Sequence, residues 1–377
     1  MDNFGYRLQA KAINLGLILF GITSPEPPSH FDIFEEWLSQ KTYGQMDFLG
    51  IPHSIEKRKN PKLILPNCKS IILVGLPNLN IAPKATPLEK YYGRVAYFAT
   101  SRDYHSVLIE KMTALRDYIY SSFDPQFHSK LCVDSKPVLE KNLAQRAGLG
   151  WIGRNSLLIS PITGSFFNLG EIFLDIDLNF SSPFANDLCK DCHLCIDACP
   201  TGCMNSNRTI NADKCISYLT IEHKGIIKRQ FRNLIENWIF GCDICQQACP
   251  FNKDFLKESE NVPDNKMGLI DLDQELMISE SEFLIKYKES PIMRIGFNGF
   301  LRNLIIAMGN SQQSNFIPAL GNILTTAQDP MLRTTSAWAL GKTLTNTSKI
   351  ILEKALKNEV NPVVREEIIL SLAGPID

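Results

Sequence analysis

The chain has 377 residues and a formal net charge of −1, with 44% hydrophobic and 21% charged residues. This ordinary globular composition excludes a largely disordered chain and supplies enough apolar residues for two or three domains. The near-zero net charge gives no overall indication of nucleic-acid binding, although it does not exclude a local basic face.

The cysteines and the N-terminal segment indicate the compartment. The chain has eleven cysteines, an odd number, and seven of them fall in two short runs. The N-terminal segment lacks the basic and apolar regions of a signal peptide, and the apolar residues 15–22 are fewer than the ~20 that a membrane span needs. We therefore expect a cytoplasmic protein, because clustered cysteines in the reducing cytosol bind metal rather than form disulfides.

Residues 1–180 are predicted to form an α/β domain. Short apolar runs predict strands at residues 70–76 (SIILVGL), 157–160 and 171–176 (EIFLDI). Helical patterns cover residues 104–120 and 138–146. This mixture fits a layered sheet, but the strand order cannot be derived from the pattern.

Residues 181–255 are predicted to form a ferredoxin-like domain. Residues 189–200 read CKDCHLCIDACP and residues 242–250 read CDICQQACP, with a predicted helix at about residues 227–240 between them. The first run has the ligand spacing of bacterial two-cluster ferredoxins, Cys-x2-Cys-x2-Cys-x3-Cys-Pro. Paired cysteines also bind zinc, but this spacing is much more specific for [4Fe–4S] clusters.

The spacing also predicts which cysteines bind which cluster. In two-cluster ferredoxins the fourth cysteine of a run binds the other cluster, because it lies a turn further on and points away. Cluster one would then take Cys189, Cys192, Cys195 and Cys249, and cluster two would take Cys199, Cys242 and Cys245.

Cluster two needs a fourth thiolate, for which Cys203 and Cys215 are the candidates. Cys203 lies only four residues after Cys199, on the turn after Pro200. Cys215 begins a new segment and can approach from elsewhere, so we favour Cys215. Cys68 and Cys132 lie outside both runs and are expected to be small buried hydrophobes.

Residues 256–377 are predicted to form HEAT-like helical repeats. The segments 300–310 (FLRNLIIAMGN), 331–342 (MLRTTSAWALGK) and 363–374 (VVREEIILSLAG) share an arginine near the start, an apolar helical face and a glycine near the end. A period near 30 residues indicates stacked helix pairs. An ordinary helical bundle is the alternative. The arginines Arg302, Arg333 and Arg365 are expected to pair within their own repeats.

Taken together, several segments resemble the epoxyqueuosine reductase (QueG) family along almost the whole chain. They are EKRKNP at 56–61, DYH at 103–105, VDSKPVLEK at 133–141, AGLGWIGRNSLLI at 147–159, both cysteine runs, CISYLTIEH at 215–223 and NWIFGCDICQQACP at 237–250. The resemblance implies a cobalamin- and iron–sulfur-dependent oxidoreductase that reduces epoxyqueuosine to queuosine in the tRNA anticodon loop. This would be the last step of queuosine biosynthesis.

The resemblance also implies site residues. Asp134 would be the acid that protonates the departing epoxide oxygen. By the resemblance, cobalamin would lie base-off, in contact with Arg58, Tyr97, Asp134, Leu158, Leu169, Ser217, Cys242 and Asp243. No Asp-x-His-x-x-Gly motif is present, so the sequence gives no independent sign of the corrinoid. The chain departs from the usual family pattern at Tyr97, Ser101, Lys136 and Cys203. At the position of Cys203, alanine is typical of the family. These departures concern local loop shape and individual cobalamin contacts, and they leave the cluster ligands and Asp134 unchanged.

The partners implied by the resemblance are tRNA and an external electron donor, such as a flavodoxin or ferredoxin system. Lys224, Arg229 and Arg294 are candidate phosphate contacts, although each also fits a solvated helical face. A monomer is the simplest oligomeric state. Two other classes are a reductive dehalogenase, which usually has a twin-arginine signal and no repeat tail, and an electron carrier, which would leave the N-terminal domain without a role.

Overall fold

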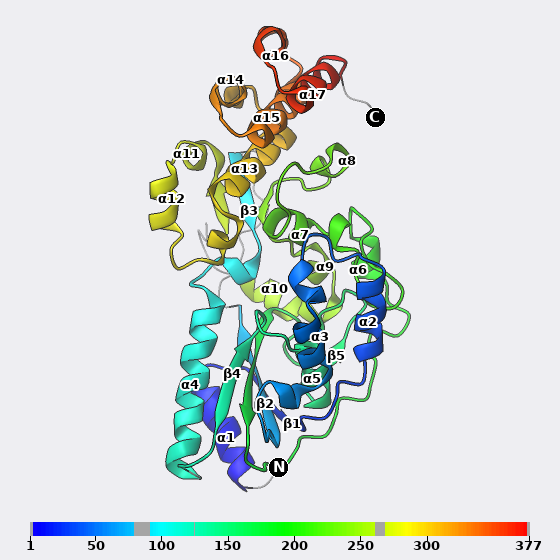
Figure 1. Ribbon diagram of the computed structural model, residues 1–377, viewed down its shortest axis with the longest axis vertical. Coiled ribbons are helices and arrows are strands. Elements are labelled where there is room, and N and C mark those ends of the chain that lie inside the picture. Colours follow the sequence, from blue (N-terminus) through cyan, green and yellow to red (C-terminus); the bar gives the residue numbers. More distant parts are fainter. Residues whose placement is uncertain (1–2, 79–90, 124, 261–267, 375–377) are drawn as a thin grey trace. The chain divides into compact units, whose positions relative to one another are not determined.

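The computed structural model describes residues 3–78, 91–123, 125–260 and 268–374 (Figure 1). The chain divides into two compact units, each built from separate segments. Unit 1 comprises Met1–Ile81, Ser101–Asp213 and Asp243–Val262, and unit 2 comprises Ala82–Thr100, Lys214–Cys242 and Pro263–Asp377. The boundaries 1–180, 181–255 and 256–377 stay a prediction.

Unit 1 contains a four-stranded sheet whose strand order the sequence did not determine. The order is β1 (Leu19–Thr23), β2 (Ser70–Pro77), β7 (Phe167–Leu174) and β4 (Ser129–Val133), and every neighbouring pair is antiparallel. The strand predicted at 70–76 is confirmed. The strand predicted at 171–176 is displaced, because β7 starts at Phe167 to pair with the end of β2.

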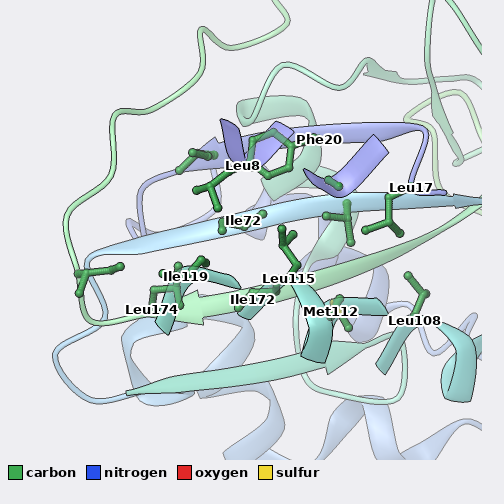
Figure 2. Close-up of a cluster of buried hydrophobic side chains, with 14 of the residues drawn as sticks. Leu8, Leu17, Phe20, Ile72, Leu108, Met112, Leu115, Ile119, Ile172 and Leu174 are labelled. Carbon is green, nitrogen blue, oxygen red and sulfur yellow. The ribbon is translucent and has the colours of Figure 1, made fainter. Parts of the chain in front are cut away.

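One face of this sheet is covered by α1 (Asn3–Asn14) and α4 (Tyr104–Ser122). Alternating residues of each strand point to this face, so Ile72 on β2 packs with Ile172 on β7. Leu8 from α1 and Leu115 from α4 complete an apolar layer, as Figure 2 shows. The helix predicted at 104–120 is thereby confirmed.

The opposite face is covered by α5 (Glu140–Arg146), which begins two residues later than predicted. Leu143 of α5 packs against Leu73 and Phe173 of the sheet. Gly21 of β1 lies directly under the end of this helix, where an added Cβ would lie 2.2 Å from the carbonyl oxygen of Ala147. Glycine at this position therefore allows helix and strand to approach.

Further short elements of unit 1 surround the cysteine loops and the pockets described below. They are α2 (Phe31–Ser39), α3 (Pro52–Lys59), β5 (Trp151–Ile152), β6 (Leu158–Ile159), α6 (Leu194–Asp197), α9 (Ile244–Gln247) and α10 (Lys253–Glu260). The strand predicted at 157–160 corresponds to β6. The helices α6 and α9 lie inside the first and second cysteine runs and pack against each other.

Unit 2 contains a three-stranded sheet of β8 (Trp238–Phe240), β3 (Tyr92–Val95) and β9 (Leu269–Asp271). The helix predicted at 227–240 is therefore wrong. Only α8 (Arg229–Arg232) is helical there, and Glu236 has a φ of +54°, which ends the helical path. The apolar residues that follow pair as a strand with β3.

The C-terminal helices of unit 2 include the predicted repeats. The three repeated segments form α13 (Phe297–Ser311), α15 (Pro330–Thr343) and α17 (Pro362–Leu372), and α13 packs on α15, which packs on α17. Between them lie α14 (Ile317–Thr326) and α16 (Asn346–Asn358). The helices α7 (Ile216–Ile221), α11 (Leu272–Leu276) and α12 (Glu280–Lys286) complete the unit.

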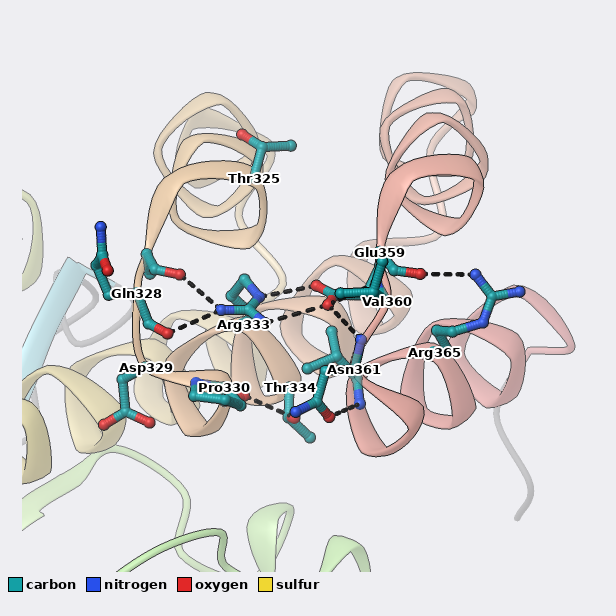
Figure 3. A network of polar contacts seen from close by, with 12 residues as sticks. Thr325, Gln328, Asp329, Pro330, Arg333, Thr334, Glu359, Val360, Asn361 and Arg365 are labelled. Carbon is teal, nitrogen blue, oxygen red and sulfur yellow. Dashed lines mark hydrogen bonds and ion pairs between the residues drawn. The ribbon is translucent and has the colours of Figure 1, made fainter.

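The three repeated arginines bind carbonyl oxygens at the ends of preceding helices. Arg333 donates to Ala327 O, just after α14, and pairs with Glu359 (Figure 3). Arg365 donates to Leu356 O and Glu359 O at the end of α16. Arg302 donates to Leu219 O, at the end of α7, at 2.9 Å. A cation at a helix C-terminus satisfies carbonyl groups without helical partners. The prediction that all three pair within their own repeats is therefore wrong for Arg302, which binds α7 outside the repeats.

Among the described helices, none combines the length and apolar character that crossing a membrane requires.

Candidate active site and cluster ligands

Asp134 directly follows β4 and lies in a network of polar side chains from the start of α4. Tyr104 OH donates to Asp134 Oδ2, and His105 Nε2 lies 2.6 Å from Asp134 Oδ1. The other ring nitrogen, His105 Nδ1, lies 2.7 Å from Asp103 Oδ1. Asp103 is also the N-cap of α4, because its side chain accepts the backbone N–H of His105 at 2.9 Å. The helix start thus fixes both donors to Asp134.

The carboxylates in this network change the protonation of its other members. The hydrogen bond with Asp134 raises the pKa of His105 to about 9, with a further contribution from Asp103. Burial and the charge of Asp134 raise the pKa of Tyr104. At neutral pH the imidazole is therefore protonated, Tyr104 keeps its proton, and both groups donate to Asp134.

A second group of ionisable side chains lies behind Asp134. Burial raises the pKa of Glu140, the first residue of α5, to about 7, although the charge of Lys141 opposes this. Lys141 donates to Ser156 O at 2.8 Å. Glu171, on β7, is 0% exposed, and neither of its carboxyl oxygens has a hydrogen-bond partner within the described part of the chain. Burial, with the charges of Glu140 and Asp134, raises the pKa of Glu171 well above its usual value.

Two pockets of unit 1 meet at Asp134, Glu140 and Lys141. The larger pocket has a volume of about 770 Å³, and its wall includes Phe34 and Trp37 of α2. The smaller pocket has a volume of about 150 Å³. Asp134 can therefore reach molecules on two sides, one of them bordered by aromatic rings.

The predicted cobalamin contacts fall into two groups, one in each unit. In unit 1, Arg58 lines the larger pocket and Leu158 and Leu169 line the smaller one, both of which Asp134 also lines. Arg58 is 6% exposed, its guanidinium lies 5.4 Å from the Phe34 ring centre, and burial lowers its pKa. Leu158 and Leu169 give the smaller pocket an apolar wall beside the carboxyl group of Asp134.

The other predicted contacts do not line these pockets. Asp243 belongs to unit 1, where it is 2% exposed and its carbonyl accepts the amide of Gln247 at 2.8 Å. Tyr97, Ser217 and Cys242 belong to unit 2. There, α7, which carries Ser217, is joined to the segment before Cys242 by a hydrogen bond of 3.0 Å from Gly241 N to Thr220 Oγ1.

The four cysteines predicted for cluster one all lie in unit 1 and influence one another. Burial raises the pKa of the Cys195 thiol, and the charges of Cys189, Cys249 and Cys192 raise it further. Trp151 Nε1 donates to Cys189 Sγ at 3.3 Å. No three His, Cys, Asp or Glu residues among those described are grouped as ligands of a single metal ion. The mutual influence of the four thiols fits a larger group, such as a cluster of four irons, that they would share.

The cysteines predicted for cluster two are divided between the units. Cys199 and Cys245 belong to unit 1, whereas Cys215 and Cys242 belong to unit 2. Hydrogen bonds, first from Cys203 and then from Thr201, lower the pKa of Cys199 to about 4. Cys199 is therefore a thiolate at neutral pH, which is the form that binds iron.

The candidate tRNA-binding cations lie in unit 2, where each already has a partner. Arg229 pairs with Glu367, and Arg294 pairs with Glu222. Lys224 Nζ donates to the carbonyl oxygen of Arg294 at 3.4 Å.

Sequence reasoning missed the roles of His105, Tyr104, Glu140 and Glu171 around Asp134. The DYH segment contributed to the resemblance, but nothing in its spacing places it against a residue about thirty positions later. Glu171 is hidden inside an apolar strand, where a single charged residue is the only available signal.

Comparisons with known proteins agree with this architecture. The family model described as "Epoxyqueuosine reductase QueG, DUF1730" matches residues 58–135. A "4Fe-4S double cluster binding domain" matches residues 188–252, and "HEAT repeats" match residues 300–373. The predictions of a double-cluster domain and of a HEAT-like tail are thereby confirmed.

Curated relatives are similar over most of their length. The chain is 33% identical to an epoxyqueuosine reductase of Bacillus subtilis, covering 96% of this chain and 95% of that protein. It is 36% identical to that of Pseudomonas aeruginosa, covering 81% and 84% respectively. Among solved structures, an epoxyqueuosine reductase with an epoxyqueuosine-modified tRNA-Tyr stem loop is 31% identical, with a TM-score of 0.86 and 98% of both chains covered. The Streptococcus thermophilus enzyme is 28% identical, with a TM-score of 0.86 and 99% of both chains covered.

Proposed function

This chain belongs to the epoxyqueuosine reductase family, and on that premise we propose that it reduces epoxyqueuosine to queuosine in the anticodon loop of tRNA. One observation of this chain's own site carries the proposal. Asp134 contacts a protonated imidazole and a tyrosine hydroxyl, and it lies where two pockets meet.

The reaction needs protons at the position that Asp134 occupies. Conversion of an epoxide to an alkene breaks both C–O bonds, takes up two electrons and two protons, and releases water. The departing oxygen is a poor leaving group unless an acid protonates it. We assign this proton transfer to Asp134, which would take a proton from the His105 imidazolium across the 2.6 Å contact at Asp134 Oδ1 and pass it to the departing oxygen.

The neighbours of Asp134 prepare this transfer. Asp103 holds His105 through Nδ1 and keeps Nε2 directed at Asp134. Tyr104 OH donates to the other carboxylate oxygen and fixes its orientation. Such fixed donors need little reorganisation when charge develops on the departing oxygen.

The electrons would come from the bound cofactors. When bound, iron–sulfur clusters and cobalamin would supply the electrons for this reduction. We propose Arg58, Asp134, Leu158 and Leu169 as cobalamin contacts, because they line the two pockets that meet at Asp134. Tyr97, Ser217, Cys242 and Asp243 stay proposals from the family resemblance.

The cluster ligands are likewise proposed. Cluster one would take Cys189, Cys192, Cys195 and Cys249, supported by the influence of these thiols on one another. Cluster two would take Cys199, Cys215, Cys242 and Cys245, supported by the matching double-cluster model.

The partners follow from the family. A relative was solved with a modified tRNA stem loop, which supports tRNA as the substrate carrier. Lys224, Arg229 and Arg294 stay candidate phosphate contacts, and each would have to exchange a partner within unit 2 to bind RNA. A flavodoxin- or ferredoxin-type donor, a cytoplasmic location and a monomeric state complete the proposal.

Metal content and turnover test this proposal. The protein would be purified anaerobically with added cobalamin, and iron and cobalt would be measured per chain. We expect about eight irons, from the two-cluster ligand count, together with one cobalt. Reductant and epoxyqueuosine-containing tRNA should then yield queuosine. Iron without cobalt, and without turnover, would instead indicate an electron carrier.

A further inference from the structure

The sulfur of Cys199 is surrounded by hydrogen-bond donors. Cys203 Sγ and Thr201 Oγ1 each lie 3.5 Å from Cys199 Sγ. The backbone amides of Thr201 and Cys203 also donate to this sulfur. Two side chains and two amides from a five-residue segment therefore converge on one predicted iron ligand.

The local backbone holds Cys203 in this position. Gly202 N donates to Cys199 O at 3.2 Å, which closes a tight turn, and Gly202 has a φ of +57°, in the left-handed region that favours glycine. Beyond the turn, Asn211 N donates to Cys203 O at 2.8 Å. Cys203 is 4% exposed, so its thiol is shielded from competing water.

Cluster binding determines the direction of the sulfur–sulfur hydrogen bond. As an iron ligand Cys199 is a thiolate without a proton, so Cys203 must be the donor. Reduction adds negative charge to a cluster and its sulfur ligands, and hydrogen bonds to these sulfurs favour the reduced state. We infer that Cys203 raises the reduction potential of the cluster bound through Cys199. The inference rests on the iron–sulfur part of the proposed function and not on the substrate.

The second cysteine run provides an internal comparison. Cys249 is followed by Pro250, as Cys199 is followed by Pro200, but Phe251 and Lys253 stand where the first run has Thr201 and Cys203. The backbone amide of Phe251 donates to Cys249 Sγ, but the phenyl side chain of Phe251 has no hydrogen-bond donor. Cluster one has a different side-chain donor, Trp151 Nε1, on Cys189. Each proposed cluster therefore has a donor that can be removed separately.

The test is an anaerobic redox titration of the cluster-loaded protein, followed by electron paramagnetic resonance. In Cys203→Ala, one of the two cluster transitions should move to lower potential and the other should stay. At a fixed potential the ratio of reduced to oxidised cluster should fall about three- to tenfold, where tenfold corresponds to 59 mV for one electron. Cys203→Ser keeps a donor and should restore part of the shift.

Trp151→Phe is the matched control and should lower the transition that Cys203→Ala leaves in place. The inference would be overturned if Cys203→Ala moved neither transition or moved both alike. A fall from about eight to about four irons in Cys203→Ala would also overturn it, because Cys203 would then be a ligand of cluster two. These measurements do not include turnover, so the cluster potentials can be interpreted even if the protein does not catalyse the proposed tRNA reaction.

Discussion

The two faces of the four-stranded sheet in unit 1 bury different kinds of side chain. The face under α1 and α4 is apolar throughout its buried cluster, with Leu8, Ile72 and Leu115 at 0% exposure. The face under α5 also has an apolar cluster, but Glu171 occupies one of its strand positions, between Leu169 and Phe173. Asp134 directly follows β4, and Cys132 of this strand pairs with Glu171 of β7.

This difference separates stability from chemistry within one sheet. A buried carboxyl group without a hydrogen-bond partner destabilises the fold, because it loses its contacts with water. Close packing on the opposite face of the sheet, under α1 and α4, offsets this loss. We call that side the apolar face and the side under α5, which holds Glu171, the polar face. The polar face can then hold ionisable groups whose pKa values depart from their usual range, as active sites require.

The largest effect is expected from Asp134→Asn on the polar face. The amide cannot carry the transferred proton, so turnover of epoxyqueuosine tRNA should fall by about 10²- to 10⁴-fold. Iron and cobalt content should not change, since the shape of the side chain is kept. Asp177→Asn is the control, because Asp177 is 80% exposed and pairs with the exposed Lys69. Full activity of Asp134→Asn would refute the acid assignment.

On the apolar face, Leu115→Ala should lower stability and leave the chemistry intact. Removing a fully buried leucine leaves a cavity and costs about 2–5 kcal/mol. Hydrogen exchange of the amides in β2 and β7 would measure this loss. Ile109→Ala, on the same helix at 40% exposure, should cost less than about 1 kcal/mol. A loss of turnover per folded molecule in Leu115→Ala comparable to that of Asp134→Asn would contradict the separation of the two faces.

A smaller, pH-dependent effect is expected from Glu171→Gln. The folded protein raises the pKa of Glu171 above 4.5, so the free-energy cost of burying this group is smallest below pH 4.5 and grows as the pH rises toward the folded value. Glutamine does not titrate. The variant should therefore gain stability relative to the parent by up to about 1.4 kcal/mol per pH unit in that window.

Hydrogen exchange of β7 at pH 5.5 and pH 6.5 would measure this difference. Glu110→Gln is the control, because Glu110 is 67% exposed and pairs with Arg102 on the surface. A Glu171→Gln variant whose relative stability did not change with pH would show that folding does not raise the pKa of Glu171.

Features that depend on neighbours in the chain could be predicted from the sequence. The strand at 70–76 and the helix at 104–120 follow from local apolar patterns, and α13, α15 and α17 follow from a repeated one. The predicted helix at 227–240 fails because a strand partner, β3, comes from far away in the sequence. Local pattern also could not show that Arg302 binds the end of α7.

The sequence by itself predicted the ligand chemistry of the cysteine runs, because three cysteines spaced by two residues can wrap around one cluster whatever surrounds them. Only the tertiary structure decided what accompanies Asp134 and Cys199. Register between β4 and β7 places Glu171 behind Asp134, and the start of α4 brings His105 and Tyr104 to Asp134. A left-handed glycine turns Cys203 back onto Cys199. Most of these contacts join residues far apart in the chain, so they depend on packing and register rather than on local spacing.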